Sequence, residues 1–205
     1  MGEAHPSRLT RRIKDMAQDS DSVPGALRLY TGDMFALDKH IVEALERQHA
    51  DDRFQTDQRV GPLVRDSLDL FRRNVNELQL HIDRLGLSAG KAVKEAVAGA
   101  LGVAAGVYDK VRKDPVSRGL RDDYIAFNHA AVSYTMLHTT ALAYGDQPLA
   151  ETAQKHLKAL TPLIMQVYEI IPHVVVTELQ DEPDAPVHRE AADLALRQGR
   201  EAWQH

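Results

Sequence analysis

The chain has 205 residues and no cysteine, which excludes disulfides, thiolate metal sites and cysteine nucleophiles. Its 25 Lys and Arg against 30 Asp and Glu give a formal charge of −5, a poor balance for a nucleic-acid binder, because phosphates demand clustered basic residues. A content of 43% hydrophobic and 27% charged residues is typical of a globular protein. No secretion signal or membrane-spanning segment is evident, so we expect a cytoplasmic protein without membrane contact.

The first part of the chain predicts a flexible tail followed by a long helix. Residues 1–24 end in a cluster of Asp, Ser, Pro and Gly residues, which disfavours regular structure. This tail carries a small basic cluster, either solvated or in weak contact with an acidic partner, made of Arg8, Arg11, Arg12 and Lys14. From about Ala26 to His49, apolar residues recur every three or four positions, as on one face of a helix.

A second helix is predicted from about Pro62 to Leu85. Its apolar seam alternates spacings of four and three without a break, as in a coiled coil, through Val64, Leu68, Phe71, Val75, Leu78, Ile82 and Leu85. Gly86 follows as a plausible C-cap, because glycine accepts the left-handed conformation that ends many helices.

A third, weaker helix is predicted from about Gly90 to Lys113. It has one apolar line and a smooth side formed by Gly99, Gly102 and Gly106. Two interpretations stay open. The segment is either a crossover helix that lies on a bundle, or its glycine-lined side binds a small ligand.

The second half of the chain predicts two further long helices. One runs from about Val116 to Tyr144, and its residues 124–144 contain no charged side chain, which predicts burial on every side and a central position. The other runs from Asp146 to about Leu179. Residues 181–205 predict an acidic tail with a short exposed helix from about Val187 to Trp203.

The pattern as a whole predicts an all-α fold. No segment alternates with the period of a strand, and four long helices have short connections except between the second and the fourth. This arrangement is typical of a ferritin-like four-helix bundle with a long crossover that carries an additional helix. The bundle would span residues 25–180, and the continuous seams of its helices predict a homodimer.

Three segments resemble the YciE/YciF-type ferritin-like family, a bacterial group linked to stress. DMFALDKHIVEALE resembles the first helix of that family and NELQLHIDRLG resembles its second. GLRDDYIAFNHAAVSYTMLHTTALAYGD resembles the next long helix, with its similar Ala-Tyr-Gly end. The resemblance covers about residues 26–179. It implies a bundle whose core holds a di-iron carboxylate site, with a Glu from each of two helices and a Glu-x-x-His from each of the other two.

Only part of that ligand set is present. Asp38 matches the Glu of the family's first helix, Glu77 and His81 match the Glu and the His or Gln of its second, and His138 alone remains on the later helix. No carboxylate lies between Asp123 and Asp146 or between Glu151 and Glu169. The resemblance therefore implies a degenerate di-iron site.

The remaining residues allow two interpretations. Asp38, Glu77, His81 and His138 supply two carboxylates and two imidazoles, a set that suits one iron, manganese or zinc ion. Alternatively, the first three are ordinary polar residues on helix flanks, and the histidines of the apolar helices, His129, His138 and His156, are satisfied core residues.

The leading functional hypothesis is a non-catalytic or degenerate ferritin-like protein of the stress-associated type. It would hold no cofactor and act through its bundle surface as a homodimer, on a protein partner that the residues do not identify. One alternative is an oxygen- or peroxide-handling metalloprotein with a reduced single-metal site of iron or manganese. The other is a helical binder of a small ligand.

Overall fold

The computed structural model describes residues 23–87, 115–182 and 186–204, and every structural statement below refers to them. This part of the chain contains six helices and no strand, so the all-α prediction is confirmed. The predicted helix at residues 90–113, its glycine-lined side and the basic cluster of the N-terminal tail lie outside the described residues.

Two long helices and a short one form the first hairpin. Helix α2 spans Gly25–His49 and helix α4 spans Val60–Arg84, both within two residues of the predicted bounds. The five-residue helix α3, Asp52–Thr56, lies between them and was not predicted. Asp51 caps α3, because its side chain accepts a hydrogen bond from a backbone N–H of the first turn. Phe54 of α3 is buried at this end of the molecule.

The second hairpin consists of helix α6, Val116–Ala143, and helix α7, Gln147–Gln180. Gly145 separates them with a positive φ of 73°, which glycine adopts without steric cost. Gly86 has a φ of 64° after α4, as the C-cap prediction requires. Helix α7 continues through two internal prolines.

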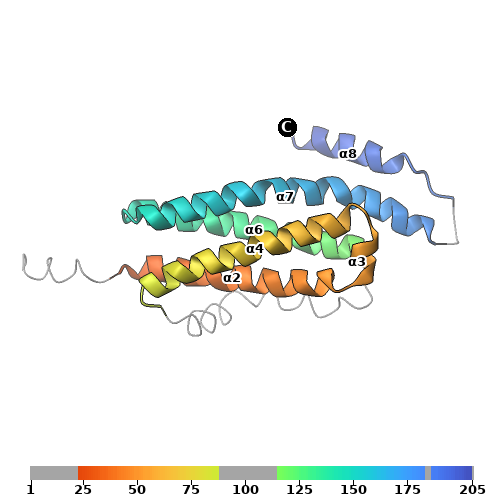
Figure 1. The fold of residues 1–205 in the computed structure, drawn as a ribbon. Helices are drawn as coiled ribbons and strands as arrows, with labels where there is room; N and C mark the ends of the chain where they lie inside the picture. Colours follow the sequence, from red (N-terminus) through yellow and green to blue (C-terminus); the bar gives the residue numbers. More distant parts are fainter. Residues whose placement is uncertain (1–22, 88–114, 183–185, 205) are drawn as a thin grey trace, which may run out of the picture.

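The four long helices pack as a bundle (Figure 1). Helix α2 contacts α4 and α6, and α7 contacts α6 and α4. Cross-helix pairs show that α2 and α6 are antiparallel, because Gln48 bonds to Asp123 and Tyr134 bonds to Asp38. Since α4 is also antiparallel to α2, α4 and α6 run in the same direction. The end of α4 and the start of α6 therefore lie at opposite ends of the bundle (Figure 1).

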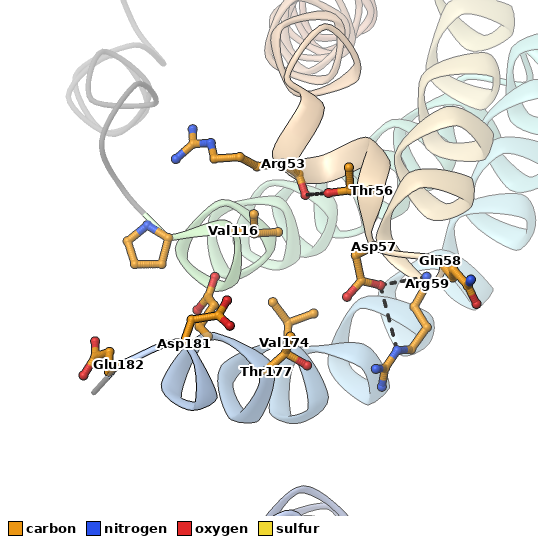
Figure 2. A pocket seen from close by; sticks show the side chains of 12 residues that line it. Arg53, Thr56, Asp57, Gln58, Arg59, Val116, Val174, Thr177, Asp181 and Glu182 are labelled. Carbon is orange, nitrogen blue, oxygen red and sulfur yellow. Dashed lines mark hydrogen bonds and ion pairs between the residues drawn. The ribbon is translucent and has the colours of Figure 1, made fainter. Parts of the chain in front are cut away.

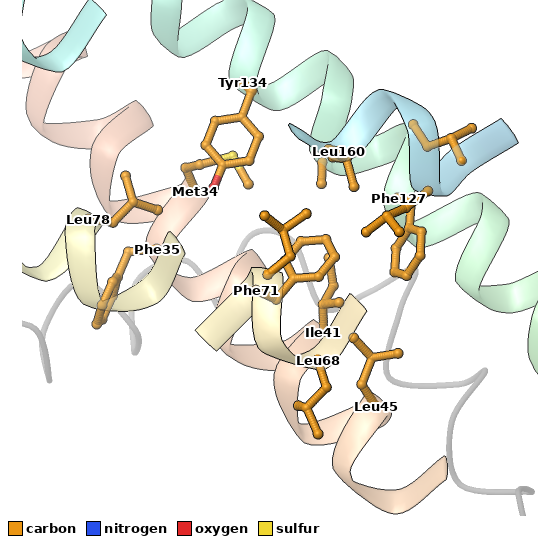
Figure 3. Close-up of a cluster of buried hydrophobic side chains, with 14 of the residues drawn as sticks. Met34, Phe35, Ile41, Leu45, Leu68, Phe71, Leu78, Phe127, Tyr134 and Leu160 are labelled. Atoms are coloured by element: carbon orange, nitrogen blue, oxygen red, sulfur yellow. The ribbon is translucent and has the colours of Figure 1, made fainter. Parts of the chain in front are cut away.

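Aliphatic and aromatic side chains from all four helices form one core (Figure 3). Phe71 of α4 and Phe127 of α6 lie at its centre with ring centroids 5.2 Å apart. The largest side chains with less than 2% exposure are Tyr134, Phe71, Phe127, Met34, Ile41, Leu45, Leu78, Ile82, Leu120, Leu137, Leu149 and Leu160. Burial of each such group contributes about 1.5–3 kcal/mol, so this core dominates the stability of the fold.

The prediction that α6 is buried on every side is wrong. Its outer face exposes Ile125 by 59%, Val132 by 60% and Met136 by 44%. A helix at the corner of a bundle contacts two neighbours and leaves the rest of its circumference free. The lack of charged residues therefore shows that this face is apolar, but it does not show that the face is buried. We call Ile125, Val132 and Met136 the α6 outer patch.

Helix α8, Ala191–Ala202, corresponds to the short helix predicted in the C-terminal tail, but it is docked on α7. Gly199 lies so close to α7 that a Cβ there would come within 2.3 Å of the Tyr168 hydroxyl. Arg200 also forms an ion pair of 2.6 Å with Glu169. The tail thus contributes one packed helix.

Helix α7 carries more apolar side chains than it buries in the core. Among the described helices, it is the one with the length and hydropathy to cross a membrane. Its inner side packs against α6 and α4, while Met165 and Val175 stay exposed. Core helices of bundles meet the same criteria, so the expected lack of membrane contact stays a prediction.

Candidate functional site

Four polar side chains are buried in the middle of the bundle, one from each long helix. They are Asp38 of α2, Asn74 of α4, Tyr134 of α6 and His156 of α7, and none is more than 1% exposed. Each follows the helical spacing of its apolar neighbours, so the same periodicity that builds the core carries these groups into it. Burial of polar groups is costly unless they bond to one another.

A chain of hydrogen bonds connects three of these side chains to the surface. The Tyr134 hydroxyl donates to Asp38 Oδ2, and His156 Nδ1 lies 3.0 Å from the same hydroxyl. The other ring nitrogen, His156 Nε2, lies 3.0 Å from Glu77 Oε2. Lys155 Nζ donates to Glu77 Oε1 over 2.5 Å. We call these five residues and Asn74 the Tyr134 cluster.

Burial governs the electrostatics at the inner end of the cluster. It raises the pKa of Asp38 well above its usual range, although the hydrogen bond from Tyr134 opposes the shift. Burial also raises the pKa of Tyr134, and the nearby Asp38 adds to this effect. The Tyr134 hydroxyl therefore stays protonated and serves as a hydrogen-bonding group.

The outer end of the cluster carries charge. Burial lowers the pKa of His156, and the hydrogen bond with Glu77 opposes this shift. Burial raises the pKa of Glu77, but hydrogen bonds from Lys155 and His156 outweigh it, so the net pKa is lowered. Glu77 is therefore ionised and paired with Lys155, and the cluster places its negative charge where water also reaches it.

The structure separates the predicted metal ligands. His81 bonds through Nε2 to Thr152 Oγ1 over 2.9 Å, and its Nδ1 lies 3.1 Å from Arg84. His138 bonds through Nδ1 to the Ala150 carbonyl over 2.9 Å. Both histidines thus have protein partners outside the Tyr134 cluster.

Of the four predicted ligands, Asp38 and Glu77 alone belong to the cluster, and Tyr134 and His156 separate them. In the described parts of the chain, no group of three or more His, Asp or Glu residues is arranged to hold a metal ion. The interpretation of His156 as a satisfied core histidine is confirmed. The same interpretation is wrong for His129, which is exposed, and Asp38 is fully buried and so is not a residue of a solvated helix flank. The roles of Asn74 and Lys155 were missed.

A second buried polar pair links α2 and α6 nearer one end of the bundle. Gln48 Nε2 donates to Asp123 Oδ1 over 2.8 Å, and both side chains are at most 3% exposed. Burial raises the pKa of Asp123 to about 7, and the neighbouring Asp122 adds to this effect. Gln48 Oε1 has no hydrogen-bond partner among the described residues.

An open pocket of about 750 Å³ lies at this end of the bundle, between the α3–α4 turn, the start of α6 and the end of α7 (Figure 2). Its wall carries both signs of charge, including Arg59, Asp57 and Glu178. Two of these groups serve the fold: Asp57 accepts from the backbone at the start of α4, and Glu178 accepts from the Ser117 N–H over 2.9 Å at the start of α6. The pocket therefore does not select a ligand of one charge.

Comparison with protein families, with curated proteins and with solved structures finds no match to this chain. The features of this chain that bear on function are therefore the Tyr134 cluster and the exposed apolar surface.

Proposed function

We propose that this chain is a ferritin-like bundle whose metal site has been replaced by a hydrogen-bonded cluster, and that it acts as a non-catalytic, stress-associated protein through its surface. The observation that carries the proposal is the Tyr134 cluster. Its buried residues come from all four long helices and project into the bundle core, as the metal ligands of ferritin-like proteins do.

The direction of the helices supports the ferritin-like part of the proposal. Helices α4 and α6 run in the same direction, so the end of α4 and the start of α6, which are consecutive described elements of the chain, lie at opposite ends of the bundle and need a long connection. A four-helix bundle with one such long connection has the topology of the ferritin-like folds.

The hydrogen bonds of the cluster support the loss of the metal. A two-metal site needs several anionic oxygens that are free to coordinate cations. Here Glu77 is paired with Lys155 and His156, and one oxygen of Asp38 is bonded to Tyr134. The positive charge that a metal would supply comes instead from the Lys155 ammonium group.

Metal content tests this proposal directly. The full chain, purified and then incubated with ferrous iron without oxygen, should retain far less than one iron per chain in elemental analysis. It should also show no ferroxidase activity when air is admitted. Two tightly bound irons per chain together with ferroxidase activity would overturn the proposal.

The α6 outer patch supports action through the surface. It belongs to a helix without charged residues from 124 to 144, and its side chains are about half exposed. Exposed apolar patches on soluble proteins commonly mark interaction sites. A second copy of the chain is the partner that we propose, since an uncharged face packs against itself without electrostatic repulsion.

Sedimentation analysis of two variants tests the dimer. Val132→Glu places a charge in the middle of the patch and should convert the dimer to a monomer. Leu80→Glu on α4 is the matched control, because Leu80 is 69% exposed and lies outside the patch, and this variant should remain dimeric. A wild-type chain that sediments as a monomer at all accessible concentrations would contradict the dimer without affecting the metal test.

A further inference from the structure

The C-terminal helix α8 packs on one side of α7 through a narrow seam (Figure 1). The seam follows the helical spacing of four and three through Ala192, Leu196 and Gly199, of which Ala192 is buried and the other two are half-buried. At Gly199 an added Cβ would lie 2.3 Å from the Tyr168 hydroxyl of α7. Two of the three seam residues are small, and this allows α8 to lie close to the aromatic side chain beneath it.

Two polar contacts set the direction of α8 on α7. Arg200 forms an ion pair of 2.6 Å with Glu169, and His173 Nε2 lies 3.8 Å from Asp193 Oδ1. The later residue of α8 thus pairs with the earlier residue of α7, so the two helices are antiparallel. We call Tyr168, Glu169 and His173 the α8 docking face. This face is complementary to α8 in shape, at the glycine, and in charge, at the arginine.

These contacts hold α8 only weakly. Arg200 and Asp193 are each more than half exposed, and ion pairs in water contribute little to stability. The helix has 12 residues and no side-chain hydrogen bond at its N-cap, and isolated helices of this length are marginal in water. Its large apolar residues Leu194 and Trp203 are exposed and add nothing to the seam. We therefore expect α8 to detach from α7 far more readily than the bundle unfolds.

We propose that the α8 docking face is an interaction surface for a second copy of the chain, whose α8 takes the place of the chain's own α8. The α8 sequence is the ligand whose fit to this face the structure shows, and every other copy carries the same sequence. Two copies that exchange their C-terminal helices keep both sets of contacts, as in domain swapping. The proposal concerns α7 and α8 and does not depend on the proposed dimer through the α6 outer patch.

Binding of a peptide tests the docking face. A fluorescent peptide of residues 186–205 represents the α8 of a second copy. The full chain with Ala192→Glu provides an open face, because a charged side chain at this buried position detaches the chain's own α8. The full chain with Ala195→Glu is the matched control, since Ala195 is exposed in the same helix and its own α8 stays docked.

The expected affinity follows from the tether between α7 and α8. Residues 181–190 hold a chain's own α8 at an effective concentration in the millimolar range, so a helix that is docked most of the time corresponds to a Kd of about 100 μM or tighter. The peptide should bind the Ala192→Glu chain with such a Kd and the Ala195→Glu chain about tenfold more weakly. No binding to the Ala192→Glu chain, or equal Kd values for the two chains, would refute the proposal.

Crosslinking tests the exchange between full chains without changing the seam. The chain has no cysteine, so a Glu169→Cys chain mixed with an Arg200→Cys chain reports contact between copies through a short bismaleimide. Both chains also carry Val132→Glu, so that the α6 outer patch does not bring them together. The mixed crosslinked dimer should form in far greater yield than when Arg197→Cys replaces Arg200→Cys, because Arg197 is exposed and points away from the seam. Equal yields in the two mixtures would show that α8 does not dock on a second copy.

Discussion

Two buried carboxyl groups lie at the interface between α2 and α6, and they differ in their hydrogen-bond partners. Asp38, in the middle of the bundle, belongs to a chain of hydrogen bonds that reaches Lys155 at the surface. Asp123, nearer one end, has a single side-chain partner in Gln48, whose own oxygen is left without a partner. Both groups are fully buried, and burial raises the pKa of each.

This difference shows that burial alone does not set the free-energy cost of a buried polar group. Asp38 bonds to a connected set that reaches solvent, whereas Asp123 has the Gln48 amide as its side-chain partner among the described residues, and burial raises the pKa of both carboxyl groups. We therefore expect both groups to make stability depend on pH, and the Tyr134 cluster to depend in addition on the completeness of its hydrogen bonds.

The largest expected effect comes from Asp123→Asn above neutral pH. The pKa of Asp123 is about 7 in the folded chain against an ordinary value of 3.8, so the folded state holds a proton that the unfolded state releases. Stability from this group therefore falls as pH rises from about 4 to 7 and stays low above, a loss of about 4 kcal/mol. The variant removes the penalty, and urea unfolding at pH 8 should show a gain approaching that size, with little change at pH 4.

The same substitution at the neighbouring residue is the control for this experiment. Asp122 is paired with Arg121 and adds only the smaller part of the upward shift of the Asp123 pKa, so Asp122→Asn should change stability at pH 8 far less than Asp123→Asn does. A wild-type unfolding curve that keeps the same midpoint from pH 5 to pH 8 would show that Asp123 does not titrate in this range.

Tyr134→Phe should be the most damaging single change in the cluster. It keeps the ring in the core but removes the hydroxyl that bonds to Asp38 and His156, and it leaves both of these groups buried without that partner. Because each unsatisfied buried group costs about 1–3 kcal/mol, we expect a loss of about 3 kcal/mol in chemical denaturation. Tyr124→Phe, at a half-buried tyrosine outside the cluster, should cost less than about 1 kcal/mol. Equal losses in the two variants would mean that the cluster is not a connected unit.

Gly119→Ala tests the packing next to the buried Gln48–Asp123 pair. Alanine normally stabilises a helix by about 1 kcal/mol relative to glycine. A Cβ at position 119, however, would lie 2.6 Å from Phe54 Cζ, and the buried ring has little room to move. Overpacking of this kind costs about 1–3 kcal/mol, so the net effect should be a loss of about 1 kcal/mol in thermal unfolding. Gly25→Ala, where a Cβ meets nothing within 4 Å, should stabilise the chain instead.

The sequence predicted the described long helices well, because a period of three and four is a local property. The bounds of α2, α4, α6 and α7 all fall within two residues of the prediction. Helix α3 was not predicted, because five residues are too few to show a helical period. The exposed face of α6 was not predicted either, because an apolar composition does not reveal which side of a helix lacks a neighbour.

The site was predicted only in part, for a physical reason. Periodicity shows which residues share a face of one helix, and on that basis Glu77 and His81 were grouped as residues four positions apart. It does not show which residue of another helix lies opposite them. The partner of Glu77 across the bundle is His156. A signal was nevertheless present at Asp38, which lies four residues after Met34 and three before Ile41, where the heptad pattern of its helix expects an apolar residue. Polar residues at seam positions of several helices predict a buried polar cluster.

The smallest expected effect comes from the outer end of the cluster. Lys155 is 65% exposed, so its ion pair with Glu77 is screened by water and Lys155→Met should cost about 0.5 kcal/mol in denaturant unfolding at low salt. High salt should abolish most of that difference, since the Debye length shortens. Lys158→Met, one turn further along α7 at a residue without a described ion pair, should cost nothing measurable. A loss as large as that of Tyr134→Phe would mean that Lys155 acts as a buried partner of the cluster, and the distinction between a connected inner core and a solvated outer end would then fail.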